Sequence, residues 1–261
     1  MKQFLLAIAS VFLLTSCNFT EEISFNPDGS GEFIMRYDMS EVMKTMEEMG
    51  GGKKDDGKEK IKLDSVMYFK DMLVEKSDSI ATLSIEEQAK LKNLENIVIK
   101  MKMDEEAGVF DLGFGSTFTN LKELPEALAK IEEAKKMNSE NNSQFGQMGE
   151  SAVAKASESV FEYVDFTYDG KTFSRFIKED YEIAPEDMET LDAEISGMGD
   201  SREVFDAMTY TLVYNFPKEI KSVTNKNAVI SDDKKSVTLK MNFIEMIKSP
   251  EAMALDVELE D

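Results

Sequence analysis

The chain offers few of the side chains that enzymes use for catalysis. Its 261 residues contain no histidine and a single cysteine, Cys17. Without histidine, the commonest general base and a common metal ligand are missing, so Ser–His and Cys–His nucleophiles and zinc sites built on histidine or cysteine are excluded. What remains is carboxylate chemistry, Ser–Lys chemistry or no chemistry. We predict that the chain is not an enzyme and uses no cofactor.

One short stretch has the oxygen ligands of a calcium site. NPDGSG, residues 26–31, places them at alternate positions and a glycine at the sixth, as in the first half of an EF-hand loop. The twelfth position, however, is Tyr37 instead of a bidentate glutamate, and strand patterns flank the stretch. We therefore predict a glycine-rich hairpin turn here and assign no metal ligands.

Four methionines suggest a different metal. Met39, Met43, Met46 and Met49 are spaced by four, three and three residues, so their thioethers would share one face of a helix, an arrangement suited to Cu(I). Methionine is abundant throughout the chain, with 18 copies. Core packing or a pliable surface for amphiphiles is therefore the favoured interpretation.

Ser231 and Lys234 spell the S-x-x-K motif of penicillin-interacting enzymes. That chemistry needs the serine at the start of a helix, whereas SDDK lies between two strand patterns, so a solvated turn is predicted. Carboxylate pairs cannot be avoided in a chain with 52 acidic residues, and no pair stands out. A carboxylate-dependent hydrolase of envelope glycans stays open as an alternative.

The residues before Cys17 are typical of a signal peptide. The uncharged apolar run 4–14 follows Lys2 and is too short to span a bilayer as a helix, which takes roughly 20 residues. LTSC, residues 14–17, resembles the lipobox of bacterial lipoproteins. The resemblance implies cleavage after residue 16 and acylation of Cys17, including palmitate-type chains, and two or more such chains anchor a protein stably.

The lipobox resemblance also bears on location. Asn18 follows the cysteine, which by analogy with enterobacterial sorting favours the outer membrane, while the periplasmic or surface face stays open. We predict a lipidated tether over residues 17–22, followed by an extracytoplasmic domain over 23–261.

Composition limits the partners. The formal net charge is −22, which repels nucleic acid and anionic headgroups, so we expect no nucleic acid partner. Membrane contact must come from the acyl anchor on Cys17 or from an apolar surface. With 42% hydrophobic residues, the chain can build one large or two small cores.

Hydrophobic periodicity predicts an α+β fold with a largely antiparallel sheet built from hairpins. Hairpins are expected around 26–31 and around Asp169-Gly170, and strands at 97–103 and over most of the last hundred residues. Helices are expected at 63–76 and from the capping pair Ser84 and Glu87 onward. Together these helices suggest a helical insertion over about 40–156.

Two segments, 21–43 and 209–243, resemble the LppM-type bacterial lipoprotein domain. The second contains NFP followed by two strands around an acidic turn. The resemblance implies an extracytoplasmic α+β domain that handles lipids or other amphiphiles, with no catalytic residues to carry over. Our first hypothesis is thus a membrane-anchored, non-enzymatic binding domain for a lipid-like ligand or an envelope protein. The alternatives are the glycan hydrolase and a structural lipoprotein that binds cations diffusely.

Overall fold

The structure is a computed structural model that describes residues 18–40, 60–129, 162–197 and 202–261, with the single positions 44, 156 and 160. Cys17 and the predicted signal peptide lie outside the described residues. Strands and helices occur together and most strand pairs are antiparallel, which confirms the predicted α+β class.

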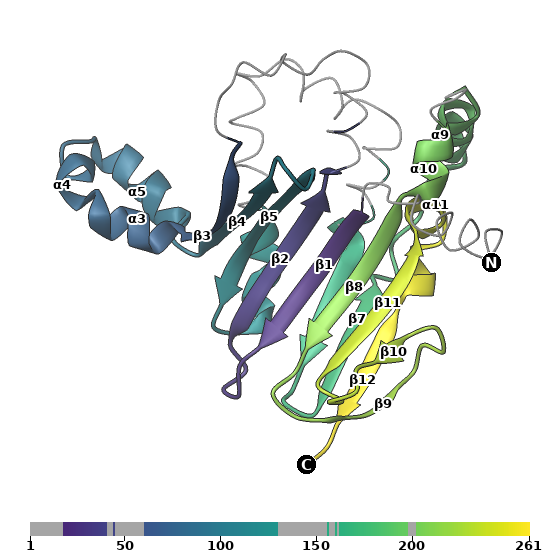
Figure 1. Ribbon diagram of the computed structural model, residues 1–261. Helices are drawn as coiled ribbons and strands as arrows, with labels where there is room; N and C mark the ends of the chain where they lie inside the picture. Colours follow the sequence, from purple (N-terminus) through teal and green to yellow (C-terminus); the bar gives the residue numbers. More distant parts are fainter. Residues whose placement is uncertain are drawn as a thin grey trace, which may run out of the picture.

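The described strands form two sheets (Figure 1). The larger sheet has the spatial order β10 (Val229–Ile230), β11 (Ser236–Asn242), β8 (Thr209–Asn215), β1 (Asn18–Phe25), β2 (Gly31–Asp38), β5 (Val109–Phe118), β4 (Ile97–Asp104) and β3 (Lys62–Tyr68). The smaller sheet has the order β6 (Val164–Tyr168), β7 (Thr172–Ile177), β12 (Leu255–Leu259) and β9 (Ile220–Val223). Among these pairs β1 and β8 run parallel, which places the first described strand beside a strand from the last quarter of the chain.

The described helices lie at the edges of the sheets. Three short helices connect β3 to β4: α3 (Phe69–Glu75), α4 (Ser77–Ile80) and α5 (Ile85–Asn93). The C-terminal half carries α9 (Pro185–Gly197), α10 (Arg202–Ala207) and α11 (Phe243–Lys248), with the 3-10 turn η5 (Pro250–Met253). A further 3-10 turn, η3 (Leu121–Glu123), follows β5.

The core lies between the two sheets. Side chains alternate along a strand, so one face of β1, β8 and β11 meets one face of β7 and β12. Buried residues on the larger sheet include Ile23, Leu212 and Leu239, and the smaller sheet contributes Phe173 and Val257. Helix α11 closes the core with Phe243, Ile244, Met246 and Ile247.

Both predicted hairpins are confirmed. The β1–β2 turn is closed by a hydrogen bond from Asn26 N to Ser30 O at 2.8 Å, and Gly29 supplies the positive φ of +85°. The β6–β7 turn contains Asp169, whose carboxylate accepts from two following backbone N–H groups, and Gly170 at φ +89°. The capping box of Ser84 and Glu87 is also present at the start of α5.

Three expectations need correction. Residues 63–76 are helical only from Phe69, because the alternation of the preceding residues pairs them with β4 as strand β3. Residues 18–22 are not a tether, because they form most of β1 and pair on both sides. The expected helical insertion over 40–156 supplies three strands, β3, β4 and β5, in the part that the structure describes.

Candidate binding surface

A buried ionic cluster joins the two sheets. It consists of Glu21 on β1, Arg175 on β7, and Tyr210 and Tyr214 on β8; Glu21 and Arg175 are each 1% exposed. The guanidinium donates twice to the carboxylate, at 3.2 Å each, and once to the Met253 carbonyl oxygen at 3.3 Å. The Tyr210 hydroxyl donates to Glu21 at 2.6 Å, and the Tyr214 hydroxyl donates to the other carboxylate oxygen.

The electrostatics of this cluster are those of a closed structural network. Burial lowers the pKa of Arg175, but the Glu21 carboxylate outweighs that effect and raises it. Burial and the same carboxylate raise the pKa of both tyrosines, so they stay neutral donors. Since each charged group is paired and out of contact with solvent, the cluster has no open position for a substrate.

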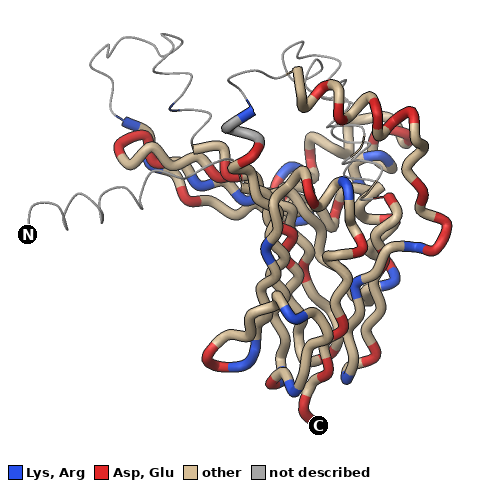
Figure 2. The backbone as a smooth tube through the Cα atoms, turned by 90° about the vertical axis from the view of Figure 1, so that its right-hand side faces the viewer, with Lys and Arg blue, Asp and Glu red and all other residues tan. Residues whose placement is uncertain are grey.

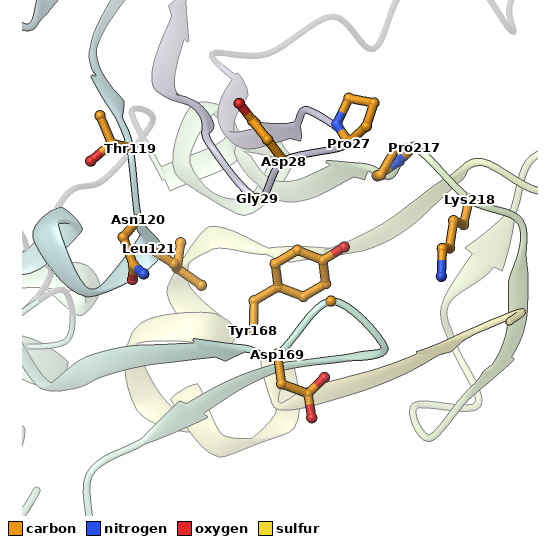
Figure 3. A pocket seen from close by; sticks show the side chains of 11 residues that line it. Pro27, Asp28, Gly29, Thr119, Asn120, Leu121, Tyr168, Asp169, Pro217 and Lys218 are labelled. Atoms are coloured by element: carbon orange, nitrogen blue, oxygen red, sulfur yellow. The ribbon is translucent and has the colours of Figure 1, made fainter.

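A cleft of about 460 Å³ lies at the end of the molecule where three turns meet. Asp28 and Asp169 line it from the β1–β2 and β6–β7 turns, and Figure 3 shows their carboxylates on opposite sides of the Tyr168 ring, pointing away from each other. Hydrogen bonds from Ser30 lower the pKa of Asp28, and backbone N–H groups of Thr172 and Lys171 lower that of Asp169. A glycosidase needs one carboxylic acid with a raised pKa, and neither residue provides it.

The structure places two of the sequence motifs in turns, as predicted. Asp28 Oδ1 accepts from the backbone and the hydroxyl of Ser30, so the calcium-like stretch is an internally bonded hairpin turn. Ser231 donates to Asp233 at 2.6 Å, and Lys234 has the positive φ of a turn residue, +56°. Among the described residues, no group of three or more acidic side chains is placed to hold a metal ion.

The methionine motif and the lipobox are mostly outside the described residues. Met39 directly follows β2, and its backbone N–H donates to Phe110 O at 2.8 Å. Met43, Met46 and Met49 are not described, and neither is Cys17. Within the described part of the chain, none of the helices combines the length and the apolar character that crossing a membrane requires.

The larger sheet extends beyond the core, and its core-side face stays apolar there. We call this part the apolar overhang: Leu63, Met67, Ile99, Met101, Met103, Phe110, Leu112 and Phe114, on β3, β4 and β5. Leu63 and Met67 are 39% and 41% exposed and the other members are half-buried, whereas Ile23 and Leu212 on the same face are fully buried. The alternation of β4 was predicted from the sequence, but its partial exposure was not.

The helical arm, α3 to α5, projects from the β3–β4 edge (Figure 1). None of its three helices contains a buried residue. A groove of about 700 Å³ runs between the helices and is lined by the apolar side chains Leu73, Val74, Ile80, Ala81, Ala89 and Leu91. Polar residues, including Lys70, Lys92 and Glu95, also line it, and Lys92 is paired with Glu95.

Exposed apolar side chains gather in this region. Of the nine large exposed hydrophobic residues in the described chain, seven fall between Ile61 and Ile85: Ile61, Leu63, Val66, Met67, Val74, Leu83 and Ile85. Val74 is 76% exposed and Ile85 is 88% exposed. Sequence reasoning missed this surface because exposure depends on tertiary packing, although the apolar residue directly after the Ser84 cap was a usable signal.

The charge of the same region differs from that of the rest. Residues 60–96 carry six lysines against seven carboxylates, a net charge of −1, while the whole chain carries −22. Figure 2 shows acidic residues spread over most of the described backbone, with lysines and arginines interspersed. The arm region is therefore apolar and nearly neutral, which are the properties of an interaction surface.

The fold and this surface define a class: an α+β domain of two sheets, with a covered core on one side and an uncovered apolar region on the other. No protein-family model and no curated protein matches the chain. Among solved structures it is similar to the folded domain of Mycobacterium tuberculosis LppM, determined by NMR, with a TM-score of 0.36 and 9% sequence identity. The match covers 94% of this chain and 91% of that one. At that score and identity the likeness carries no inference about function.

Proposed function

We propose that this protein is a lipid-anchored, non-enzymatic binding domain of the bacterial cell envelope, and that the helical arm with the adjoining edge of the sheet is its binding surface. The observation that carries the binding role is the concentration of exposed apolar side chains between Ile61 and Ile85. The anchor rests on the lipobox resemblance of residues 14–17 and on the apolar run before them.

An apolar partner fits the surface on energetic grounds. Removing one fully exposed large aliphatic side chain from water contributes about 1.5–3 kcal/mol, so the seven partly exposed side chains are together a substantial source of binding free energy, from which the cost of association is subtracted. The arm groove suits the apolar side of an amphiphile or of a partner protein. The lysines that line the groove are compatible with a polar or anionic headgroup.

The alternative hydrolase finds no support at the end cleft. Its two carboxylates do not converge, and the pKa of each is lowered by hydrogen bonds within its own turn. The absence of histidine from the whole chain removes the commonest proton-transfer group.

Site-specific photocrosslinking tests the binding surface. The full chain is expressed in its bacterial envelope with p-benzoylphenylalanine at position 85, and a matched chain carries it at position 229, where Val229 is also exposed (66%) but lies on the opposite edge of the sheet. We expect a defined adduct from position 85, and mass spectrometry of the adduct separates lipid from protein. Equal or absent adducts at both positions would refute the assigned surface.

The anchor has its own test. Mass spectrometry of the N-terminal peptide should show an acylated Cys17 as the first residue, and a Cys17→Ala variant should leave the membrane fraction. An unmodified thiol would refute the anchor without affecting the crosslinking result.

A further inference from the structure

Strand β3 ends the larger sheet, and one side of its backbone has no partner among the described residues. Glu105 N donates to the Ile61 carbonyl oxygen at 3.1 Å. Ile61, just before β3, and Glu105, just after β4, therefore form a hydrogen-bonded pair that continues the register of the two strands. Such pairs recur at every second residue of an antiparallel ladder. Leu63, Ser65 and Met67 therefore direct their backbone groups toward β4.

The other positions of β3 face outward. By the same alternation, the backbone N–H and C=O groups point away from the sheet at Lys62, Asp64, Val66 and Tyr68. Tyr68 is the N-cap of α3, so its carbonyl oxygen accepts the first hydrogen bond of that helix. Four donors and three acceptors thus form an unused hydrogen-bonding edge. The opposite side of β4 agrees with this assignment, because Thr117 N donates to Asn96 O at 2.8 Å.

The features that normally protect an edge strand are weak here. Sheet edges are usually short, contain proline or carry charges that hinder pairing. β10, the other edge, has two residues, but β3 has seven, with no proline and with Val66 51% exposed. The Lys62 ammonium is paired with Asp104 at 2.8 Å, so its charge is balanced within the protomer.

We propose that β3 pairs with β3 of a second copy, antiparallel and about a two-fold axis through Ser65, and joins the two larger sheets into one. In this register Lys62 lies opposite Tyr68 and Asp64 opposite Val66 of the second copy. All seven residues are paired, and on each strand the backbone N–H groups of Asp64, Val66 and Tyr68 donate to free carbonyl oxygens of the other copy. A partner that is a copy of the same chain follows from this self-complementarity.

Neighbouring registers fit less well. A shift that centres the axis on residue 64 places two Asp64 carboxylates directly opposite each other, and like charges in that position destabilise a strand pair. A shift that centres it on residue 66 leaves Lys62 opposite the helical Lys70 and pairs only the last five residues of β3. The axis through Ser65 is thus the register that uses the whole strand without opposing like charges.

The same arrangement would also extend the apolar overhang. Leu63 and Met67 lie on the overhang face. In this register Leu63 of one copy lies opposite Met67 of the second copy. The overhangs of the two copies then form one continuous apolar face. The helical arms follow Tyr68 in each copy, so the antiparallel arrangement places them at opposite ends of the seam.

Disulfide crosslinking in the native envelope tests the register. In the full chain carrying Ser65→Cys, the two Cα atoms would lie about 4.5 Å apart, as non-hydrogen-bonded pairs do, which is within the range of a disulfide. The control is Val66→Cys, whose Cα atoms would be roughly 8–9 Å apart across the axis, beyond that range. We expect Ser65→Cys to form a disulfide dimer at least tenfold faster than Val66→Cys. No dimer, or equal rates, would overturn the proposal.

Two further variants separate pairing from chance collision. Adding Val66→Pro to Ser65→Cys removes one outward N–H and no bond to β4, so crosslinking should fall to the level of the Val66→Cys control. Ser65→Lys keeps every backbone group and places two lysines face to face at the axis. It should abolish co-isolation of two differently tagged copies, and co-isolation at the unsubstituted level would contradict the pairing.

Discussion

Replacing Arg175 by methionine should destabilise the protein more than any other single change that the structure suggests. Methionine fills much of the arginine's volume but removes the two hydrogen bonds to Glu21 and the one to the Met253 carbonyl oxygen. The Glu21 carboxylate, 1% exposed, is left with the two tyrosine hydroxyls as its only described donors.

The expected loss of folding free energy follows from leaving the buried Glu21 carboxylate without its charged partner. Breaking a fully buried ion pair by removing one partner costs about 3–5 kcal/mol, and an unsatisfied carbonyl group adds about 1 kcal/mol. The sum, about 4–6 kcal/mol, approaches the whole stability of a typical domain, about 5–15 kcal/mol. Arg175→Met should therefore fold poorly at 37 °C.

A double-mutant cycle distinguishes this account from simple loss of packing. Glu21→Leu likewise leaves the Arg175 guanidinium buried without its carboxylate partner. The combined Glu21→Leu and Arg175→Met variant, in contrast, has neither charge of the pair. We expect the combined cost to fall short of the sum of the single costs by about 3 kcal/mol, measured by urea denaturation and circular dichroism. Additivity within about 0.5 kcal/mol would refute the reasoning, because independent contacts add.

Three more predictions test other parts of the molecule. Gly115→Ala places a Cβ 1.8 Å from the Phe33 carbonyl oxygen and should cost about 3 kcal/mol or more in urea denaturation, whereas Gly197→Ala, with open space around it, should be neutral. Tyr181→Phe removes a buried hydroxyl that has no hydrogen-bond partner among the described residues, so the melting temperature should stay equal or rise; a clear drop would contradict this assignment. The pKa of Asp169 is lowered by backbone N–H donors, so the folded state binds fewer protons than the unfolded state. The stability that the ionised Asp169 contributes is present above about pH 4 and is lost below it. Asp169→Asn should therefore flatten the acid limb of a curve of folding stability against pH.

The sequence predicted the local elements well because their signals are local. The Asp169-Gly170 turn, the Ser84 and Glu87 capping box and the alternation of β4 each depend on residues a few positions apart. The region 63–76 shows the limit of such reasoning. Its apolar residues satisfy a helical and an alternating pattern at once, and the long-range pairing with β4 decides for a strand up to Tyr68.

The buried ionic cluster was harder to predict than the local elements because its parts are distant in the chain. Glu21 and Arg175 are separated by 154 positions. A usable signal existed, since Glu21 alternates in phase with Ile23 and Phe25, and Arg175 with Phe173, which places both charges on core-facing positions. Alternation shows that such a charge must be buried and paired, but it does not reveal which residue is the partner.

The two halves of the larger sheet differ in what they do: one is covered and stabilises the fold, and the other is half-exposed and carries the proposed binding and pairing surfaces. On the β1 and β8 side, the second sheet covers the apolar face, and both charged groups of the ionic cluster are hydrogen-bonded. On the β5, β4 and β3 side, the same alternation continues, and the described residues leave the face half-exposed and the last strand unpaired. The free energy that burial of this second half would release is therefore still available in the protomer, and an apolar partner bound over this face would release it, whereas pairing at β3 satisfies the backbone edge and leaves the face open. Substitutions on the first half should lower the free energy of unfolding, and substitutions on the second half should weaken association while the protomer stays folded.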